Sequence, residues 1–293
     1  MDNPATLLST PGAVVLAGLW GALWGSFLNV CIARVPRGLS VVRPGSHCFA
    51  CKAPVRAFDN IPILSYLLLR GRCRACGARF SARYALVELL TALLSAAIYW
   101  KFVATGLSSD AGGAIAVPLA RFSLYFAFTA TLIVLAFIDL DTKLLPDVIT
   151  LPAIPIFFLG SFGAHDVPWS ERAIGAAAGY LFIRIIADAY YYLLKREGMG
   201  LGDGKLLAVI GAVLGWKSLP IVLVVGSLLG SLISIPVLVA ARRRAGAAPA
   251  PPEGDDEHSL RRVQVPFGPF LAMGALIFLF AGSAILRLVL PPD

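Results

Sequence analysis

Two aspartates in apolar surroundings are the residues of this chain that could act chemically as a pair. Asp139 ends an apolar run that reads LIVLAFIDLDTKLLPD, and Asp203 lies in the glycine-rich sequence GMGLGDGKLL. An ionisable side chain at such a position is costly unless it has a function or reaches the membrane interface. Two carboxyl groups a few ångströms apart share a proton, so that one acts as a base on water while the other polarises a carbonyl group. This chemistry is typical of peptide-bond hydrolysis.

Each of these aspartates also has a purely structural interpretation. Asp139 could face water at a helix end, and Asp203 could simply cap the start of a helix. Of the nearby acidic residues, Asp141 is expected on a solvated turn and Asp147 as the cap of the next apolar run. Lys205 could reach the membrane interface or pair with Asp203. No Ser–His or Cys–His catalytic set competes, because none of the three histidines, His47, His165 and His258, is placed near a plausible nucleophile.

Four of the five cysteines form two C-x2-C pairs in one polar loop. Cys48 pairs with Cys51 and Cys73 with Cys76, and 21 residues separate the pairs. This spacing is typical of a tetrahedral zinc site, and a reducing cytoplasm disfavours disulfides. Four thiolates leave no position for water, so we expect a structural ion that stabilises a loop too small for a strong core. Cys31 stands apart and is expected to be an inert thiol.

The elements that must position these groups are hydrophobic helices. The 293-residue chain is 58% hydrophobic and only 14% charged, and its apolar residues form long runs, as membrane helices of about 20 residues require. We expect an all-α polytopic membrane protein with about eight transmembrane helices and a small cytoplasmic zinc-knuckle domain. The eight runs cover residues 12–33, 84–104, 116–138, 148–163, 172–194, 203–216, 218–240 and 266–289.

Lysine and arginine alternate from one side of these runs to the other. Loop 34–83 carries ten of them and loop 241–265 carries five, whereas segments 105–115 and 164–171 carry none. The positive-inside rule places the basic loops in the cytoplasm and both termini outside. The net charge of +8 therefore reports membrane topology, and we expect the lipid bilayer as a partner and no nucleic acid. Asp139 and Asp203 then both lie at cytoplasmic helix ends, where they can meet.

The same pattern divides the chain into five predicted parts. Between the spans, the cysteine loop forms a small domain, and the segment ARRRAGAAPAPPEGDDEHSLRRVQV is expected to be a flexible linker because it is rich in alanine, proline and charge. The parts are a first transmembrane helix at 1–33, a cytoplasmic four-cysteine zinc-binding domain at 34–83, a transmembrane core with the aspartyl protease site at 84–240, the cytoplasmic linker at 241–265 and a last transmembrane helix at 266–293.

Five long motifs extend through nearly the whole chain. They read GSFLNVCIARVPRG at 25–38, NIPILSYLLLRGRCRACGARFSARYALVEL at 60–89, FIDLDTKLLPD at 137–147, GMGLGDGKLLAVIGAVLGW at 198–216 and VPFGPFLA at 265–272. Together they resemble the type IV prepilin peptidases, which are membrane aspartic proteases of the GxGD class. The resemblance implies that Asp139 and Asp203 are the catalytic pair and favours Asp139 over Asp141 and Asp147.

The resemblance also implies a substrate and a second activity. Members of this family cut the basic leader from prepilins and pseudopilins of type IV pili and type II secretion systems at the cytoplasmic face. Many also methylate the new N-terminus with S-adenosylmethionine. The sequence thus predicts a multi-pass enzyme of the bacterial inner membrane whose active site faces the cytoplasm. We expect Glu88, Asn60 and Gly71 to hold the methyl donor. The alternative is a peptidase alone, with a structural zinc domain.

A non-enzymatic interpretation is a transporter that uses paired carboxylates as a proton relay. Such a protein would carry polar residues through the depth of several helices, whereas the acidic residues here gather at one face. Asp188 is the main exception, and Arg184 lies one helical turn away and could pair with it.

Overall fold

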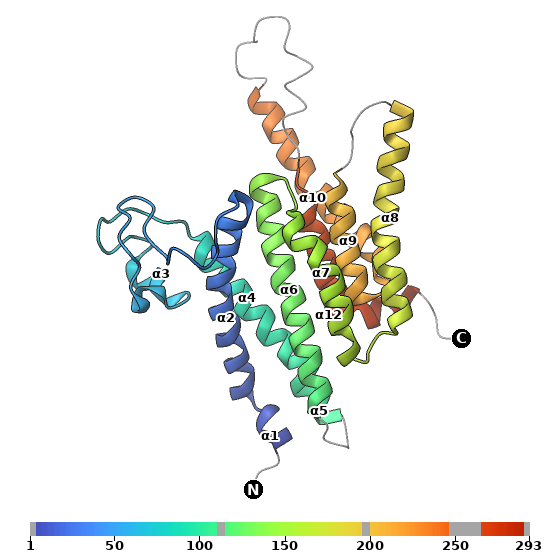
Figure 1. The fold of residues 1–293 in the computed structure, drawn as a ribbon, viewed down its shortest axis with the longest axis horizontal. Coiled ribbons are helices and arrows are strands. Elements are labelled where there is room, and N and C mark those ends of the chain that lie inside the picture. The colour runs from blue at the N-terminus through green and yellow to red at the C-terminus, as the bar shows by residue number, and fades with distance from the viewer. Residues whose placement is uncertain (1–3, 110–114, 195–199, 246–264, 290–293) are drawn as a thin grey trace, which may run out of the picture. The chain divides into compact units, whose positions relative to one another are not determined.

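The computed structural model describes residues 4–109, 115–194, 200–245 and 265–289. Within these ranges the chain is helical and forms no sheet, with only two isolated β-bridges, His47 with Pro54 and Arg72 with Arg79. The helices group into two compact units, Met1–Leu135 with Ile156–Asp166 and Ala136–Pro155 with Val167–Asp293. The predicted all-α fold is confirmed (Figure 1).

The first unit is built around two long helices that lie side by side, α2 and α4 (Figure 1). Their backbones come so close that a Cβ on Gly25 would lie 2.7 Å from the Cα of Glu88. The hydroxyl of Ser95 donates to the Ala17 carbonyl at 2.6 Å across the same interface. This unit contains α1 (Pro4–Leu8), α2 (Pro11–Arg34), η1 (Val35–Arg37), η2 (Ala57–Asn60), α3 (Leu64–Leu69), α4 (Arg83–Tyr99), the π-helical turn η3 (Trp100–Ala104), α5 (Thr105–Ser109), η4 (Ser161–Gly163) and parts of α6 (Ala116–Thr142) and α7 (Asp147–Gly160).

The second unit surrounds a short helix, α9, which is buried along nearly all its length from Gly204 onward. Glycines let α8 touch it directly, since a Cβ on Gly175 would lie 2.6 Å from the Gly211 carbonyl oxygen. The fully buried Arg172 donates to the Val213 carbonyl at 2.5 Å and so satisfies the end of α9. This unit contains the last turns of α6, the first half of α7, α8 (Trp169–Leu194), α9 (Leu201–Leu214), α10 (Ser218–Ala245) and α12 (Gly268–Val289).

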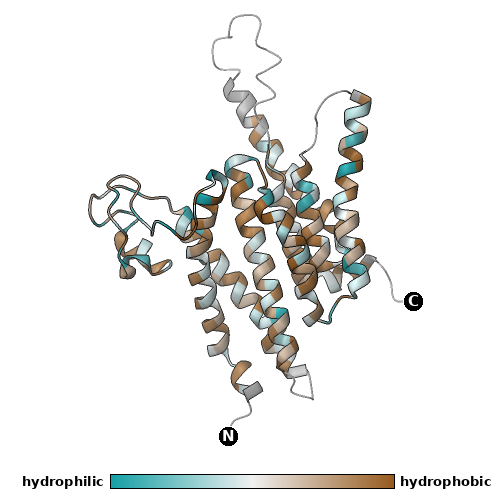
Figure 2. Cartoon of the chain, in the orientation of Figure 1, coloured by the Kyte–Doolittle hydropathy of each residue, from teal (hydrophilic) through white to brown (hydrophobic). Residues whose placement is uncertain are grey.

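All eight predicted apolar runs are helices, and six of them are long and apolar enough to cross a membrane. The other two, α7 and α9, have 14 residues each and are shorter than a full span requires. Large apolar side chains such as Leu16 (67% exposed) and Leu193 (81% exposed) point outward from the spans, and apolar residues cover the long helices (Figure 2). Such surfaces fit lipid and not water. The six spans are Pro11–Arg37, Arg83–Leu107, Ala116–Thr142, Trp169–Leu193, Ser218–Val237 and Gly268–Leu288.

Some of the sequence predictions fall outside the described residues. These are most of the predicted linker, residues 246–264, and the start of the glycine-rich motif, Gly198 and Met199. The boundaries between the five predicted parts remain predictions.

The α8–α9 contact leads to a prediction for Gly175→Ala. The added methyl group meets backbone atoms of α9, which cannot move aside as a flexible side chain would, and overpacking of this kind costs about 1–3 kcal/mol. We expect a lower melting temperature of the detergent-solubilised protein. Gly160→Ala is the control, because its nearest neighbour would be Leu124 at an ordinary 3.7 Å. Equal melting temperatures for the two variants would contradict the tight α8–α9 packing.

Candidate functional site

Asp139 lies near the C-terminal end of α6, within the second unit. Its side chain is buried, with 5% of the residue surface exposed. Its Oδ2 accepts a hydrogen bond of 2.9 Å from the backbone N–H of Gly268, the first residue of α12. The N–H groups at a helix start lack partners inside the helix and favour negative charge, so the carboxylate of α6 is held by the start of α12.

Asp203 lies in the first turn of α9, which is not one of the six spans. Its N–H donates to the carbonyl of Gly200, the residue that precedes the helix. Burial raises the pKa of Asp203 to about 6, and repulsion by the Asp139 carboxylate acts in the same direction. Because that repulsion requires proximity, the structure brings the two predicted aspartates into one electrostatic environment.

Glycines next to Asp203 allow its helix to approach neighbouring segments. A Cβ on Gly202 would lie 3.2 Å from Leu145 Cβ, and one on Gly204 would lie 3.1 Å from Ile183 Cβ. Larger residues at these two positions would push the start of α9 away from the loop after α6 and from α8. The glycine-rich sequence therefore has a packing role that also places the carboxyl group of Asp203.

The acidic residues near Asp139 lie in different surroundings. Asp147 is the first residue of α7, one position after the place of a cap, and its Oδ1 accepts from Lys205 Nζ at 2.5 Å. Lys205 therefore pairs with Asp147 and not with Asp203, which was one of its two predicted alternatives. Asp141 is exposed, as expected, but it lies in the last turn of α6 and not on the turn after it. Neither Asp141 nor Asp147 shares the burial of Asp139.

Asp188 forms the predicted ion pair within α8. Its Oδ2 accepts from Arg184 Nε at 2.8 Å, and both side chains are about half exposed. A local, exposed pair explains this acidic residue without a proton relay.

Gly268 is a residue of this site that the sequence analysis did not single out. Its only sequence signal is its place in the motif VPFGPFLA, where prolines stand on both sides. It lies 129 residues from Asp139 in the chain, so no local pattern links the two.

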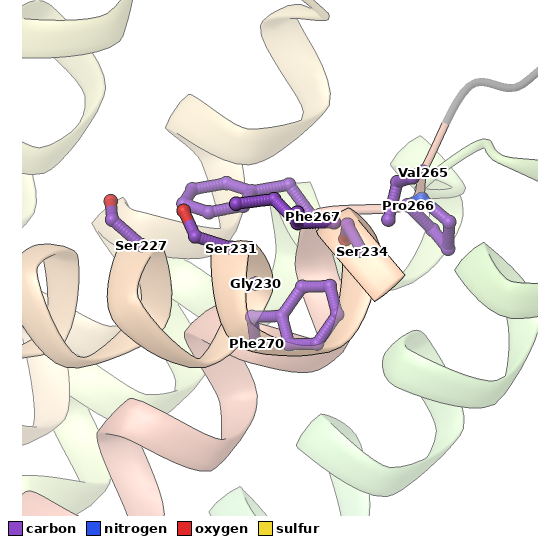
Figure 3. A pocket seen from close by; sticks show the side chains of 9 residues that line it. Ser227, Gly230, Ser231, Ser234, Val265, Pro266, Phe267 and Phe270 are labelled. Carbon is purple, nitrogen blue, oxygen red and sulfur yellow. The ribbon is translucent and has the colours of Figure 1, made fainter. Parts of the chain in front are cut away.

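A groove of about 330 Å³ opens between α10 and the start of α12 (Figure 3). Ser227, Ser231 and Ser234 line one wall, at spacings of four and three residues that place them on one face of α10. The rings of Phe267 and Phe270 line the other wall (Figure 3). Since Gly268 lies between these two phenylalanines, the groove adjoins the segment that binds Asp139.

The four cysteines come together in the first unit. Their Sγ atoms all lie within 4.8 Å of one another, with separations of 3.8 Å for Cys48 and Cys76 and 4.0 Å for Cys51 and Cys73. Sulfur atoms around a tetrahedral zinc ion are roughly 3.8 Å apart, given zinc–sulfur bonds of about 2.3 Å. The cluster therefore has the size of a metal site with four thiolate ligands.

The two C-x2-C pairs form equivalent knuckles. In the first, the N–H of Lys52 donates to the Cys48 carbonyl at 2.9 Å, and in the second the N–H of Gly77 donates to the Cys73 carbonyl at 2.9 Å. Both turn residues have a positive φ, +59° for Lys52 and +70° for Gly77. Each turn points its two thiols in the same direction, which is what a shared metal ion requires.

Hydrogen bonding polarises this set of thiols. The N–H groups of Cys51 and Ala50 lower the pKa of Cys48 to about 6. For Cys76 the N–H of Ala78 favours the thiolate, but hydrogen bonds with the other three cysteines outweigh it and raise its pKa to about 11. A cation would relieve this competition, because all four sulfurs could then be ionised.

The three residues predicted to hold a methyl donor lie in the first unit and do not form a closed site by themselves. Glu88 is half-buried, and its Oε2 accepts from the N–H of Ile63 at 2.7 Å. Asn60 is exposed at the end of η2, three residues before Ile63. Gly71 is buried with a φ of +65°, and its N–H donates to the Tyr66 carbonyl at 3.0 Å. The loop from Asn60 to Ile63 therefore joins two of the three.

Comparison with known proteins relates both units to one kind of enzyme. The model of the Bacterial Peptidase A24 N-terminal domain matches residues 19–102, and that of the Type IV leader peptidase family matches residues 126–235. The first match includes the four cysteines, and the second includes Asp139 and Asp203.

The chain is also similar to curated proteins named prepilin leader peptidase/N-methyltransferase. It is 38% identical to the one from Neisseria gonorrhoeae, over 82% of this chain and 88% of the relative. It is 39% identical to the one from Aeromonas salmonicida, over 93% and 92%, and 33% identical to the one from Pseudomonas aeruginosa, over 96% and 95%. No solved structure matches the chain.

The cysteine cluster predicts that the purified protein retains about one metal ion per chain. We expect Cys48→Ser and Cys73→Ser each to lose the ion, because each removes one of four ligands. Metal content measured by mass spectrometry is the readout. Cys31→Ser is the control, since Cys31 lies outside the cluster. Retention of the ion by both ligand variants would show that the cluster does not bind it.

Proposed function

The chain belongs to the type IV leader peptidase family and is a peptidase that is also a methyltransferase; from this premise we propose that it cleaves the basic leader from type IV prepilins or pseudopilins and methylates the new N-terminus. The observation that supports cleavage is the shared environment of Asp139 and Asp203 at the ends of two helices. Two neighbouring carboxyl groups that share one proton are the functional core of an aspartic protease.

Cleavage proceeds by attack of a water molecule on the scissile carbonyl. One carboxylate accepts a proton from this water, while the other carboxyl group donates its proton to the carbonyl oxygen. No metal is needed for this step, because proton transfer by the aspartates supplies the activation. The raised pKa of Asp203 supports a protonated carboxyl group in this pair.

The position of the aspartates suits a substrate that enters from the cytoplasm. A prepilin presents a short basic leader followed by an apolar helix, and the scissile bond between them falls at the membrane interface. Asp139 lies near one end of a span, and Asp203 lies at the start of a helix that follows another. In the topology predicted from the alternating loop charges, these helix ends lie on the same side as the basic loops 34–83 and 241–265, so we place this face in the cytoplasm, at the inner membrane of a bacterium.

The test is co-expression with a prepilin, followed by immunoblotting for the leader. We expect Asp139→Asn and Asp203→Asn to lower cleavage by at least about 1,000-fold, since members of a catalytic set act as a unit. Asp141→Asn and Asp147→Asn are matched controls, because each removes one carboxylate near the site while leaving the pair intact. Normal cleavage by either pair variant would refute the two-aspartate mechanism.

We assign the metal site to zinc and to a structural role. Four thiolates complete a tetrahedral shell and leave no open coordination position for water, so the ion would hold the loop 48–76 in its fold and supply no chemistry. S-adenosylmethionine is the proposed methyl donor, with Glu88, Asn60 and Gly71 as residues near its site. The linkage of Glu88 to Ile63 supports this placement, because it orders the loop that follows Asn60.

Methyl transfer is tested with labelled S-adenosylmethionine and a cleaved pilin as acceptor. We expect Glu88→Gln to lower methyl transfer by about 10-fold or more while prepilin cleavage continues, because a hydrogen bond to a charged group is worth about 1.5–3 kcal/mol. Asp166→Asn is the control, a change of the same kind in the same unit, at a carboxylate bound by Tyr125. If the wild type transfers no label, the peptidase-only alternative is correct.

A further inference from the structure

The two aspartates differ in their hydrogen-bond partners. Asp139 Oδ2 accepts the Gly268 N–H at 2.9 Å, whereas among the described residues no donor reaches the side chain of Asp203. A backbone N–H can only donate, so it stabilises a carboxylate more than a protonated carboxyl group. The geometry thus makes the two members of the pair unequal.

The first turn of α12 is arranged to offer this one donor. The N–H groups of Phe270 and Leu271 both donate to the Phe267 carbonyl, at 3.1 and 3.2 Å, and Pro269 has no N–H. The N–H of Gly268 is left to bind Asp139. Together with the helix dipole, it presents positive charge to the Asp139 carboxylate.

Residue 268 is glycine because the carboxylate comes so close. A Cβ at this position would lie 2.7 Å from Asp139 Oδ2 and 3.3 Å from its Cγ. The backbone of Gly268 has no positive φ, so the conformation alone would accept other residues. What excludes a side chain is contact with Asp139.

We propose that Gly268 is a positioning residue that holds Asp139 as the ionised general base and thereby leaves the shared proton on Asp203. This assignment rests on the proposed peptidase activity, and it adds which aspartate is the general base and which is the general acid. The raised pKa of Asp203, to about 6, is consistent with it, because burial is the larger cause and repulsion by the Asp139 carboxylate adds to it.

The resulting reaction balances without any other group. The water oxygen bonds to the scissile carbon, one water proton moves to Asp139, and Asp203 gives its proton to the carbonyl oxygen. As the C–N bond then breaks, the proton on Asp139 moves to the leaving nitrogen and a hydroxyl proton of the intermediate returns to Asp203. The pair ends as it began, with Asp139 ionised and Asp203 protonated.

Other charged groups around the pair do not determine this order. Lys205 of α9 is engaged by Asp147 of α7, and the Arg184–Asp188 pair of α8 is about half exposed. The described side chains of α10 carry no charge. On α12 the charged side chain is that of Arg287, in the last turn. On α6 and the turn after it, the charged neighbours of Asp139 are Asp141 and Lys143, both exposed.

The first experiment measures kcat/KM for prepilin cleavage against pH, with full-length protein in lipid nanodiscs. We expect Gly268→Ala to lower the maximum by about 10- to 100-fold, the range for a hydrogen bond to a charged group. We also expect the acidic limb to move to higher pH by about one unit, because the carboxylate loses its donor. Gly274→Ala is the matched control. Its methyl group would meet the Val222 carbonyl at 2.8 Å, which strains the same helix without touching Asp139, so the limb should stay in place.

The outcomes separate the inference from the function on which it rests. If Gly268→Ala keeps the wild-type acidic limb, Gly268 only packs and the inference is wrong, although cleavage stands. If the wild type leaves prepilin uncut, the proposed function fails instead.

A second measurement decides the inference even if Gly268→Ala does not fold. The wild-type minus Asp203→Asn infrared difference spectrum, recorded between about pH 5 and pH 6, should contain the carbonyl stretch of a protonated carboxylic acid. Its absence would mean that Asp203 is not protonated, which would overturn the assignment.

Discussion

The structure depends on keeping two carboxyl groups close together in a helical bundle with little water. Burial disfavours each charge, and proximity disfavours having both. In the proposed pair a shared proton removes one charge, and the Gly268 N–H stabilises the carboxylate of Asp139 at 2.9 Å. The site therefore requires that α6 and the start of α12 stay within hydrogen-bonding distance and that Asp203 of α9 stay near Asp139.

Such distances require helix packing of high accuracy, and glycines provide it in the second unit. In lipid the hydrophobic effect does not drive helices together, so close backbone contact and hydrogen bonds must do so. Gly175 and Gly179 bring α8 onto α9, with predicted Cβ approaches of 2.6 Å to carbonyl oxygens of Gly211 and Leu207. The buried Arg172 then fastens the far end of α9 through Val213. The short helix that carries Asp203 is therefore fixed at both ends.

The sequence was sufficient to predict the elements, because length and hydropathy determine which segments can be membrane helices. It also predicted the cysteine cluster, since each C-x2-C pair forms its knuckle locally and the structure brings the pairs within 4.8 Å. Contacts between helices that are far apart in the sequence could not be predicted from it. The partner of Lys205 remained open because 58 residues separate it from Asp147. Gly268 was missed because its role appears only when α12 meets α6.

The groups proposed for the two activities lie in different parts of the chain, yet the chain does not separate them cleanly. The cysteine cluster and Glu88 belong to the first unit, and both aspartates belong to the second. However, α6 contributes to both, since residues before Ala136 pack with the first unit while Asp139 belongs to the second. In the first unit, Phe128 of this helix packs against Phe157 of α7 with ring centroids 5.9 Å apart. The helix that carries Asp139, a proposed catalytic residue, thus has its first part in one unit and its last turns in the other. The groups proposed for methyl transfer and for cleavage therefore belong to different units, and α6 contributes residues to both units.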